Sequence, residues 1–211
     1  MTDASLTAEK LLQAEAVKLS PAKPFTWASG WQSPIYCDNR KLLSLPFTRD
    51  FIKSELANIV FEKFPDAEVV AGVATAGIAW GAMVADQLKL PFIYVRPKPK
   101  EHGLGNQIEG DFKTNQKVVV IEDLVSTGKS SLQVVDVLRS AGLEVVGMVS
   151  IFTYMFDTAG KAFSESGIEL ISLTNYPALI DLAIKKGIIA NAAKDILLKW
   201  QADPAGWTGV Y

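Results

Sequence analysis

The chain has 211 residues, of which 49% are hydrophobic and 21% are charged, and these values are typical of one globular domain. Its 21 basic and 23 acidic residues give a net charge of −2, so a polycationic surface for nucleic acid is not expected. No apolar run reaches membrane-spanning length, the first residues are too polar for a signal peptide, and the single cysteine, Cys37, cannot form an internal disulfide. We therefore expect a cytoplasmic protein without nucleic-acid or membrane partners.

The chain begins with a helical spacing of leucine and alanine, which predicts a helix over residues 6–19 that ends before Ser20 and Pro21. Residues 21–45 are rich in proline, serine, glycine and aromatic residues, which predicts an irregular hood or a small ribbon. Beyond them, β-branched runs alternate with amphipathic segments. Strands are predicted at 69–72, 92–95, 118–121, 145–151 and 169–173. Helices are predicted at 47–64, 78–88, 130–140, 177–186 and 190–201.

This alternation of strands and helices indicates an α/β fold with a mostly parallel central sheet flanked by helices. No repeat, low-complexity tract or linker interrupts the pattern, so residues 1–211 are predicted to form a single domain. The aromatic tail at 200–211 is expected to pack across the body of this domain or against a partner.

The stretch VVVIEDLVSTGKSS, residues 118–131, carries the strongest functional signal. Glu122 and Asp123 follow a buried strand, at the sheet edge where ligands bind in open α/β sheets. Ser126, Thr127 and Gly128 then form a turn that opens a helix, and main-chain N–H groups at such a start bind phosphate. Carboxylates for sugar hydroxyls beside a phosphate site predict a site for a phosphorylated ribose.

Two other interpretations of this stretch are open. It resembles the end of a nucleotide-binding P-loop, but the first glycine of that motif would fall at Asp123, whose charge would repel a triphosphate. Alternatively, the acids merely cap a strand and Thr127 is an ordinary helix N-cap, with no ligand involved.

A second signal lies at 94–110, YVRPKPKEHGLGNQIEG. Every second position is basic, which places these side chains on one face of an extended segment: Arg96, Lys98, Lys100 and His102. Prolines favour the extended form, and the glycines that follow supply hinges. The pattern predicts a mobile cationic lid; the alternative is a solvated basic loop.

Two further segments each allow two interpretations. The turn GVATAG at 72–77 could bring the main chain of 74–76 close to a pyrophosphate, or could simply pack a helix on a strand. In the hood, Tyr36 could present its ring to a flat base or form part of a hydrophobic flap. Asp38 and Arg40 could pair with each other, or reach the ligand or a second subunit.

Three motifs carry a family resemblance. EDLVSTGKS resembles the phosphoribosyl pyrophosphate (PRPP) loop of type I phosphoribosyltransferases. R-x-x-x-K-x-H-G followed by N-x-x-E-G resembles the lid of orotate phosphoribosyltransferases, and residues 25–40, FTWASGWQSPIYCDNR, resemble their hood. The resemblance implies the type I phosphoribosyltransferase fold, with an N-terminal helix and hood over 1–45 and a flexible lid over 96–112. It implies transfer of 5-phosphoribose from PRPP to orotate in UMP synthesis, with Mg²⁺ held mainly by PRPP and water.

The resemblance also assigns roles to individual residues. Lys100, His102 and Asp123 would be catalytic, and Ser126 would contact orotate. The residues that would bind PRPP are Arg96, Lys100, His102, Glu122, Asp123, Leu124, Val125, Ser126, Thr127, Gly128, Lys129 and Ser130. The family implies a homodimer in which each lid covers the site of the other subunit.

The sequence departs from the family at several cationic positions. Residues without a positive charge stand where many members carry one: Ala28, Ala76, Pro97 and Tyr154. The hood residues that would contact the orotate carboxylate are therefore left open. Two alternative functions are a same-fold enzyme for another base, against which the lid and hood argue, and a PRPP-sensing regulator, for which a nucleic-acid surface would be expected.

Overall fold

The computed structural model describes residues 4–98 and 107–209 of the chain. Its centre is a six-stranded sheet with the strand order β10-β9-β8-β5-β6-β7. The strands are β5 (Val69–Val73), β6 (Phe92–Val95), β7 (Ile108–Glu109), β8 (Lys117–Val125), β9 (Glu144–Thr153) and β10 (Leu170–Asn175). All neighbouring strands pair in parallel except β6 and β7, which are antiparallel. The predicted mostly parallel sheet is therefore confirmed.

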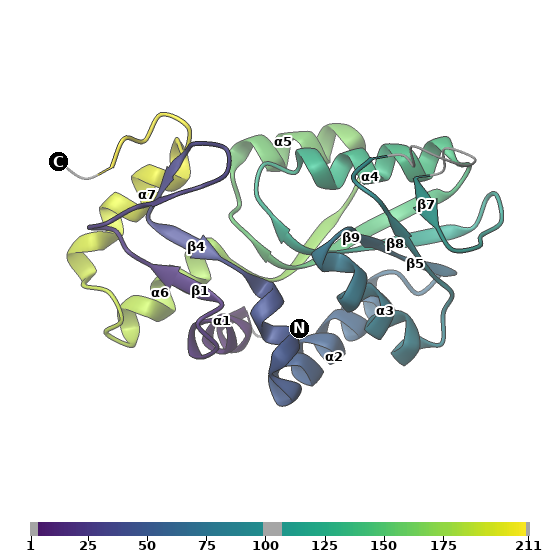
Figure 1. Cartoon of the computed structure of the whole chain (residues 1–211), viewed down its shortest axis with the longest axis horizontal. Coiled ribbons are helices and arrows are strands. Elements are labelled where there is room, and N and C mark those ends of the chain that lie inside the picture. The colour runs from purple at the N-terminus through teal and green to yellow at the C-terminus, as the bar shows by residue number, and fades with distance from the viewer. Residues whose placement is uncertain (1–3, 99–106, 210–211) are drawn as a thin grey trace.

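Helices cover both faces of the sheet, as Figure 1 shows. On one face lie α4 (Lys129–Ser140) and α5 (Asp157–Ser166), and on the other lie α2 (Pro46–Lys63) and α3 (Ala76–Leu88). The remaining helices are α1 (Ala4–Gln13), α6 (Tyr176–Lys185), α7 (Lys194–Ala202) and the 3-10 helices η1 (Asn39–Ser44) and η2 (Asn191–Ala193). Every helix predicted from periodicity is present; the ends of most of them differ by a few residues, the first is much shorter than predicted, and α5 was not predicted.

The central strand β8 has a hydrophobic core on each side. Val118 and Val120 pack in the cluster that includes α4 and α5, whereas Val119 and Ile121 pack in the cluster on the opposite face. All four side chains are fully buried. Because successive side chains of a strand point to opposite faces, an unbroken apolar run is what a strand with two covered faces requires.

The hood consists of two small antiparallel ribbons. The first pairs β1 (Val17–Leu19) with β4 (Ile35–Cys37), and the second pairs β2 (Phe25–Thr26) with β3 (Gln32–Ser33). In Figure 1 the hood lies beside α6 and α7, at the opposite end of the sheet from β7. The predicted small ribbon is confirmed, and its position brings chain segments from both ends of the sequence together.

The first helix is shorter than the periodicity predicts. α1 ends at Gln13, and the main chain then turns through Glu15, which has a positive φ of 50°. The N–H of Ala16 donates to the carbonyl of Leu11 at 3.0 Å and closes the helix end. The residues that follow form β1, so the predicted helix over 6–19 is wrong beyond residue 13.

Two features of the sheet determine which residues lie at its ligand-binding edge. β8 extends to Val125, four residues beyond its predicted end, so Glu122 and Asp123 are part of the strand. The neighbouring turn between β5 and α3 lies against it closely, since a Cβ on Gly77 would come within 2.5 Å of the Ile121 carbonyl oxygen. The packing interpretation of the 72–77 turn is therefore confirmed for Gly77, and the same contact sets this turn beside the carboxyl end of β8.

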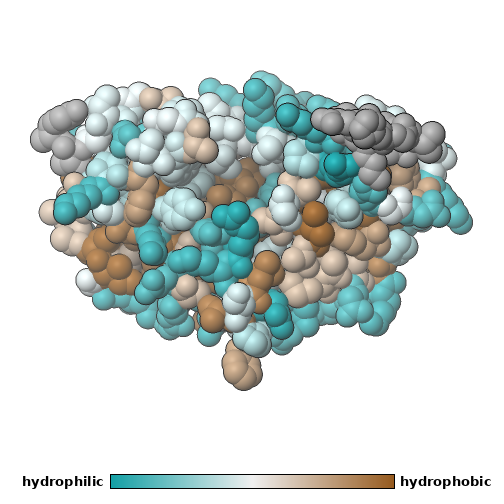
Figure 2. Space-filling view, viewed as in Figure 1, coloured by the Kyte–Doolittle hydropathy of each residue, from teal (hydrophilic) through white to brown (hydrophobic). Residues whose placement is uncertain are grey.

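The outer surface shows mixed polarity. Figure 2 shows hydrophilic residues gathered in the middle of the viewed face, with hydrophobic areas to either side. Within residues 4–98 and 107–209, no helix is both long and apolar enough to cross a membrane.

Candidate active site

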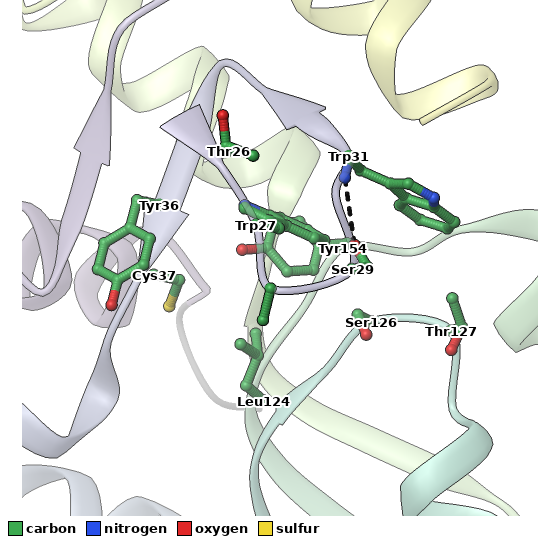
Figure 3. A pocket seen from close by; sticks show the side chains of 11 residues that line it. Thr26, Trp27, Ser29, Trp31, Tyr36, Cys37, Leu124, Ser126, Thr127 and Tyr154 are labelled. Atoms are coloured by element: carbon green, nitrogen blue, oxygen red, sulfur yellow. Dashed lines mark hydrogen bonds between the residues drawn. The ribbon is translucent and has the colours of Figure 1, made fainter. Parts of the chain in front are cut away.

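Two clefts open side by side at the carboxyl end of β8. The first, which we call the aromatic cleft, has a volume of about 520 Å³ and lies between the hood and β8 (Figure 3). Its walls include Trp27, Trp31 and Tyr36 from the hood and Tyr154 from the segment after β9. Trp27 and Tyr154 contact each other, with ring centroids 5.1 Å apart. The cleft therefore offers flat apolar faces of the kind that bind a planar ring.

The second cleft, which we call the acidic cleft, has a volume of about 380 Å³. Glu122 and Asp123 lie on one side, the 74–76 turn on another, and Asp38 and Arg40 of the hood on a third. Cys37 and Leu124 line both clefts. A ligand with one part in each cleft would therefore pass over these two side chains.

The two carboxylates of the acidic cleft are held differently. Glu122 is almost fully buried; its Oε1 accepts from the N–H of Asp123 at 2.9 Å and its Oε2 accepts from the hydroxyl of Ser131 at 3.2 Å. Burial, and next the charge of Asp123, raise the pKa of Glu122 well above its ordinary value. Burial also raises the pKa of Asp123, against the hydrogen bond from Glu122 and the charge of Arg40. The site therefore disfavours two negative charges until a cationic group arrives.

Arg40 and Asp38 form an ion pair at the rim of the acidic cleft. Arg40 Nε lies 2.7 Å from Asp38 Oδ1, and the guanidinium holds the pKa of Asp38 below its ordinary value. The local ion pair predicted from sequence is confirmed. Because Arg40 also lines the cleft, it adds a cation to the site that motif matching did not assign.

A buried asparagine joins the hood to the acidic pair. Asn39 is fully buried; its Nδ2 donates to the main-chain oxygen of Asp123 at 2.7 Å, and its Oδ1 accepts from the thiol of Cys37 at 3.3 Å. Burial raises the pKa of the Cys37 thiol, which therefore stays protonated and acts as a donor here. No local sequence pattern indicates a role for Asn39, because its partner lies 84 residues away.

The loop after β8 divides between the clefts. Ser126 and Thr127 line the aromatic cleft, whereas Ser130, in the first turn of α4, lines the acidic cleft. Gly128 is the N-cap of α4, with φ of 78° and no side-chain capping bond, so the interpretation of Thr127 as an ordinary N-cap is wrong. The Lys129 side chain is exposed, and Val125 is fully buried in the core, so only main-chain atoms of Val125 could face a ligand.

The predicted lid is described only at its two ends. The N–H of Arg96 donates to the Gln107 carbonyl at 2.9 Å, and Gln107 Nε2 donates to the Arg96 carbonyl at 2.7 Å. Arg96 also lies 3.6 Å from Glu109 and lines a smaller cleft of about 360 Å³ that shares Ser130 with the acidic cleft. The predicted catalytic residues Lys100 and His102 lie outside the described residues.

Across residues 4–98 and 107–209, no group of three or more His, Cys, Asp or Glu side chains could hold a metal ion. The Glu122–Asp123 pair supplies two carboxylates to a cleft that has room for a ligand.

Comparison with known proteins identifies the family. Residues 49–174 match the model of the phosphoribosyl transferase domain, which defines the class as a phosphoribosyltransferase. The chain is 55% identical over 202 residues to the orotate phosphoribosyltransferase of Phocaeicola vulgatus, covering 96% of this chain and 95% of that protein. It is 52% identical over 200 residues to the enzyme of that name from Listeria innocua, covering 95% and 96%.

Solved structures agree. The crystal structure of orotate phosphoribosyltransferase from Aeropyrum pernix has a TM-score of 0.75 at 31% identity, over 87% of this chain and 99% of that one. Leishmania donovani UMP synthase has a TM-score of 0.77 at 28% identity, over 94% of this chain, which spans only 42% of that longer protein. The chain belongs to the orotate phosphoribosyltransferase family, so the family and the type I fold predicted from the three motifs are confirmed.

Proposed function

We propose that this protein transfers 5-phosphoribose from PRPP to N1 of orotate, giving orotidine 5′-phosphate and pyrophosphate in UMP synthesis. One observation carries the proposal: an aromatic cleft and an acidic cleft share Cys37 and Leu124 at their junction. A flat base in the first and a phosphorylated ribose in the second would meet there. Holding two reactants in contact in this way lowers the barrier to their reaction, because the entropy of bringing them together is lost on binding and not in the chemical step.

The acidic cleft suits the ribose. Asp123 and Glu122 can accept hydrogen bonds from its hydroxyls, and a carboxylate there favours the positive charge that develops on the ring as its bond to pyrophosphate breaks. The 5-phosphate would lie at the start of α4, where Ser130 and free main-chain N–H groups act as donors. No nucleophile from the protein is required, because orotate attacks directly.

The leaving pyrophosphate would lie between the 74–76 turn and Arg40, both of which line the acidic cleft. Mg²⁺, when bound with PRPP, supplies positive charge to the phosphate oxygens, and the two clustered carboxylates fit a cation that keeps most of its ligands from PRPP and water. Arg40 can reach phosphate oxygens from the rim while it remains paired with Asp38.

The lid would complete the site. Lys100 and His102 would donate to the leaving pyrophosphate, with Arg96 at the base of the lid, and each lid would act on the other subunit of a homodimer. The motif resemblance supports this arrangement, and the hydrogen-bonded pair Arg96 and Gln107 provides a fixed base for it. We propose a cytoplasmic location, in keeping with the unpaired thiol of Cys37.

The test is PRPP-dependent consumption of orotate, with uracil and adenine as competing substrates. Uracil is the informative competitor, because no charged side chain is found among the described residues that line the aromatic cleft, and uracil differs from orotate by lacking the carboxylate. We expect turnover of orotate alone. Turnover of uracil at a comparable rate would show that the enzyme accepts a neutral base and would refute the assignment of orotate as its specific substrate. No turnover of any base would refute the whole proposal.

A further inference from the structure

The last turn of α7 packs directly behind the aromatic cleft. Trp200 is fully buried, and its ring lies 5.6 Å from Trp27 and 5.6 Å from Tyr154, measured between ring centroids. Trp27 and Tyr154 line the cleft, whereas Trp200 does not. Trp200 therefore lies immediately behind two of the side chains that line the cleft.

Two consecutive residues of α7 form hydrogen bonds to the two segments that carry Trp27 and Tyr154. Trp200 Nε1 donates to the main-chain oxygen of Gln32 in the β2–β3 ribbon at 3.0 Å. Gln201 Nε2 donates to the main-chain oxygen of Tyr154 at 2.8 Å. The hood segment that carries Trp27 is thus tied to α7 through Gln32, and the segment after β9 is tied to it through Tyr154.

The hood wall depends on such contacts because its own ribbon is very small. β2 and β3 pair over only two residues each, Phe25 with Ser33 and Thr26 with Gln32. A two-stranded ribbon of this length is not stable by itself in water, so its position must be set by the rest of the protein. The indole of Trp27 makes one such contact, to the carbonyl of Ile35 at 3.1 Å, and Trp200 makes another.

We propose that Trp200 and Gln201 are positioning residues for the base: they hold in place the part of the aromatic cleft that Trp27 and Tyr154 form together. The inference rests on the proposed function, since it assigns the aromatic cleft to orotate. It predicts different effects on the two substrates. PRPP would bind in the acidic cleft, and neither Trp200 nor Gln201 is among the residues that line that cleft.

The chain offers a matched control for Trp200. Trp80 in α3 is also fully buried, and its Nε1 has no hydrogen-bond partner among the described residues. Trp200→Phe and Trp80→Phe therefore remove the same atoms from a buried site, but only the first removes a hydrogen bond. Gln201→Met keeps the side-chain length and removes the donor to Tyr154. Because this position is partly exposed, the variant provides a second test if Trp200→Phe does not fold.

The experiment measures the KM for orotate, the KM for PRPP and the melting temperature of the wild type and the three variants. Loss of one neutral hydrogen bond corresponds to roughly a three- to tenfold effect. We expect the KM for orotate to rise by about that factor in Trp200→Phe and Gln201→Met, with the KM for PRPP within about twofold of the wild type. Trp80→Phe should change neither KM, even if its melting temperature falls as far as that of Trp200→Phe.

Three results would overturn the inference. The first is an unchanged KM for orotate in both α7 variants, the second is an equal rise of both KM values, and the third is a rise in Trp80→Phe that matches its loss of stability. An inactive wild type would instead refute the proposed function. Orotate binding measured by calorimetry would then still decide the role of α7, since equal affinities in the wild type and Trp200→Phe would exclude it.

Discussion

The buried carboxyl of Glu122 predicts that this active site is held at the expense of stability. In Glu122→Gln the side chain keeps its size, its oxygen can still accept from the N–H of Asp123, and its amide can donate to the Ser131 hydroxyl. What the substitution removes is the ionisation of a buried group beside another carboxylate. We therefore expect Glu122→Gln to be more stable than the wild type at neutral pH and less active.

The pH dependence follows from the direction of the shift. The pKa of Glu122 lies above its ordinary value in the folded protein, so above that ordinary value the folded state retains a proton that the unfolded state has released. The free energy of unfolding of the wild type then falls as the pH rises through this window. Because glutamine does not titrate, the advantage of Glu122→Gln should be small near pH 4.5 and should grow towards pH 8.

The magnitude can be bounded. Replacing a strained active-site group commonly gains about 0.5–2 kcal/mol. In a chain of this size each kcal/mol raises Tm by roughly 2–4 °C. Thermal unfolding monitored by circular dichroism at pH 5 and pH 8, with PRPP absent, measures the difference. A Tm of Glu122→Gln below that of the wild type at both pH values would falsify the account of Glu122 as a destabilised carboxyl, as would a difference that does not grow with pH.

Three further predictions concern the reaction. Asp123→Asn should lower kcat/KM at least about tenfold, or roughly 1.4 kcal/mol, with little change in Tm, because it removes a charge from an open cleft; near-normal kinetics with a lowered Tm would show that Asp123 only stabilises the strand. Equal amounts of Lys100→Ala and Asp123→Asn, each with strongly reduced activity alone, should regain about a quarter of wild-type activity if lids act across a dimer. No recovery, once subunit exchange is shown by mixed-label mass spectrometry, would rule out sharing. Ala28→Lys, which restores a cation where many family members carry one, should lower the KM for orotate by roughly tenfold through a charged hydrogen bond, whereas an unchanged KM would mean that Ala28 does not face the carboxylate.

Five of the six strands and the mostly parallel character of the sheet could be predicted from the sequence because they depend on local patterns, whereas β7, α5 and the order of the strands in the sheet were not predicted. The run at 118–121 is apolar at every position, and that pattern is sufficient for a strand with two covered faces. The end of α1 could not be predicted, because helical spacing continues past Gln13 and only the left-handed Glu15 stops the helix. The full length of β8 could not be predicted either, because the charged residues Glu122 and Asp123 interrupt the apolar run before the strand ends at Val125.

The candidate site shows the same division. Motifs identified Glu122 and Asp123 because their spacing from the helix start is fixed along the chain. Asn39 and Trp200 could not be found in that way, since their hydrogen-bond partners lie 84 and 168 residues away. Side chains that touch substrate can be read from a motif, whereas side chains that position the motif depend on how the whole chain folds.

Tyr154 illustrates how the aromatic cleft can work without the arginine that many family members carry at this position. Its side chain is almost fully buried, and burial raises the pKa of its phenol well above the ordinary value, so the group stays neutral. A neutral ring in contact with Trp27, Phe152, Phe156, Tyr176 and Trp200 contributes shape and packing to the cleft but no charge. Selectivity for the base would then depend on the positions of the aromatic side chains that line the cleft, together with the hydroxyls of Ser126 and Thr127. Small movements of the walls would matter more in such a cleft than in one that binds a carboxylate through an ion pair, and this is why residues behind the walls are expected to affect orotate and not PRPP.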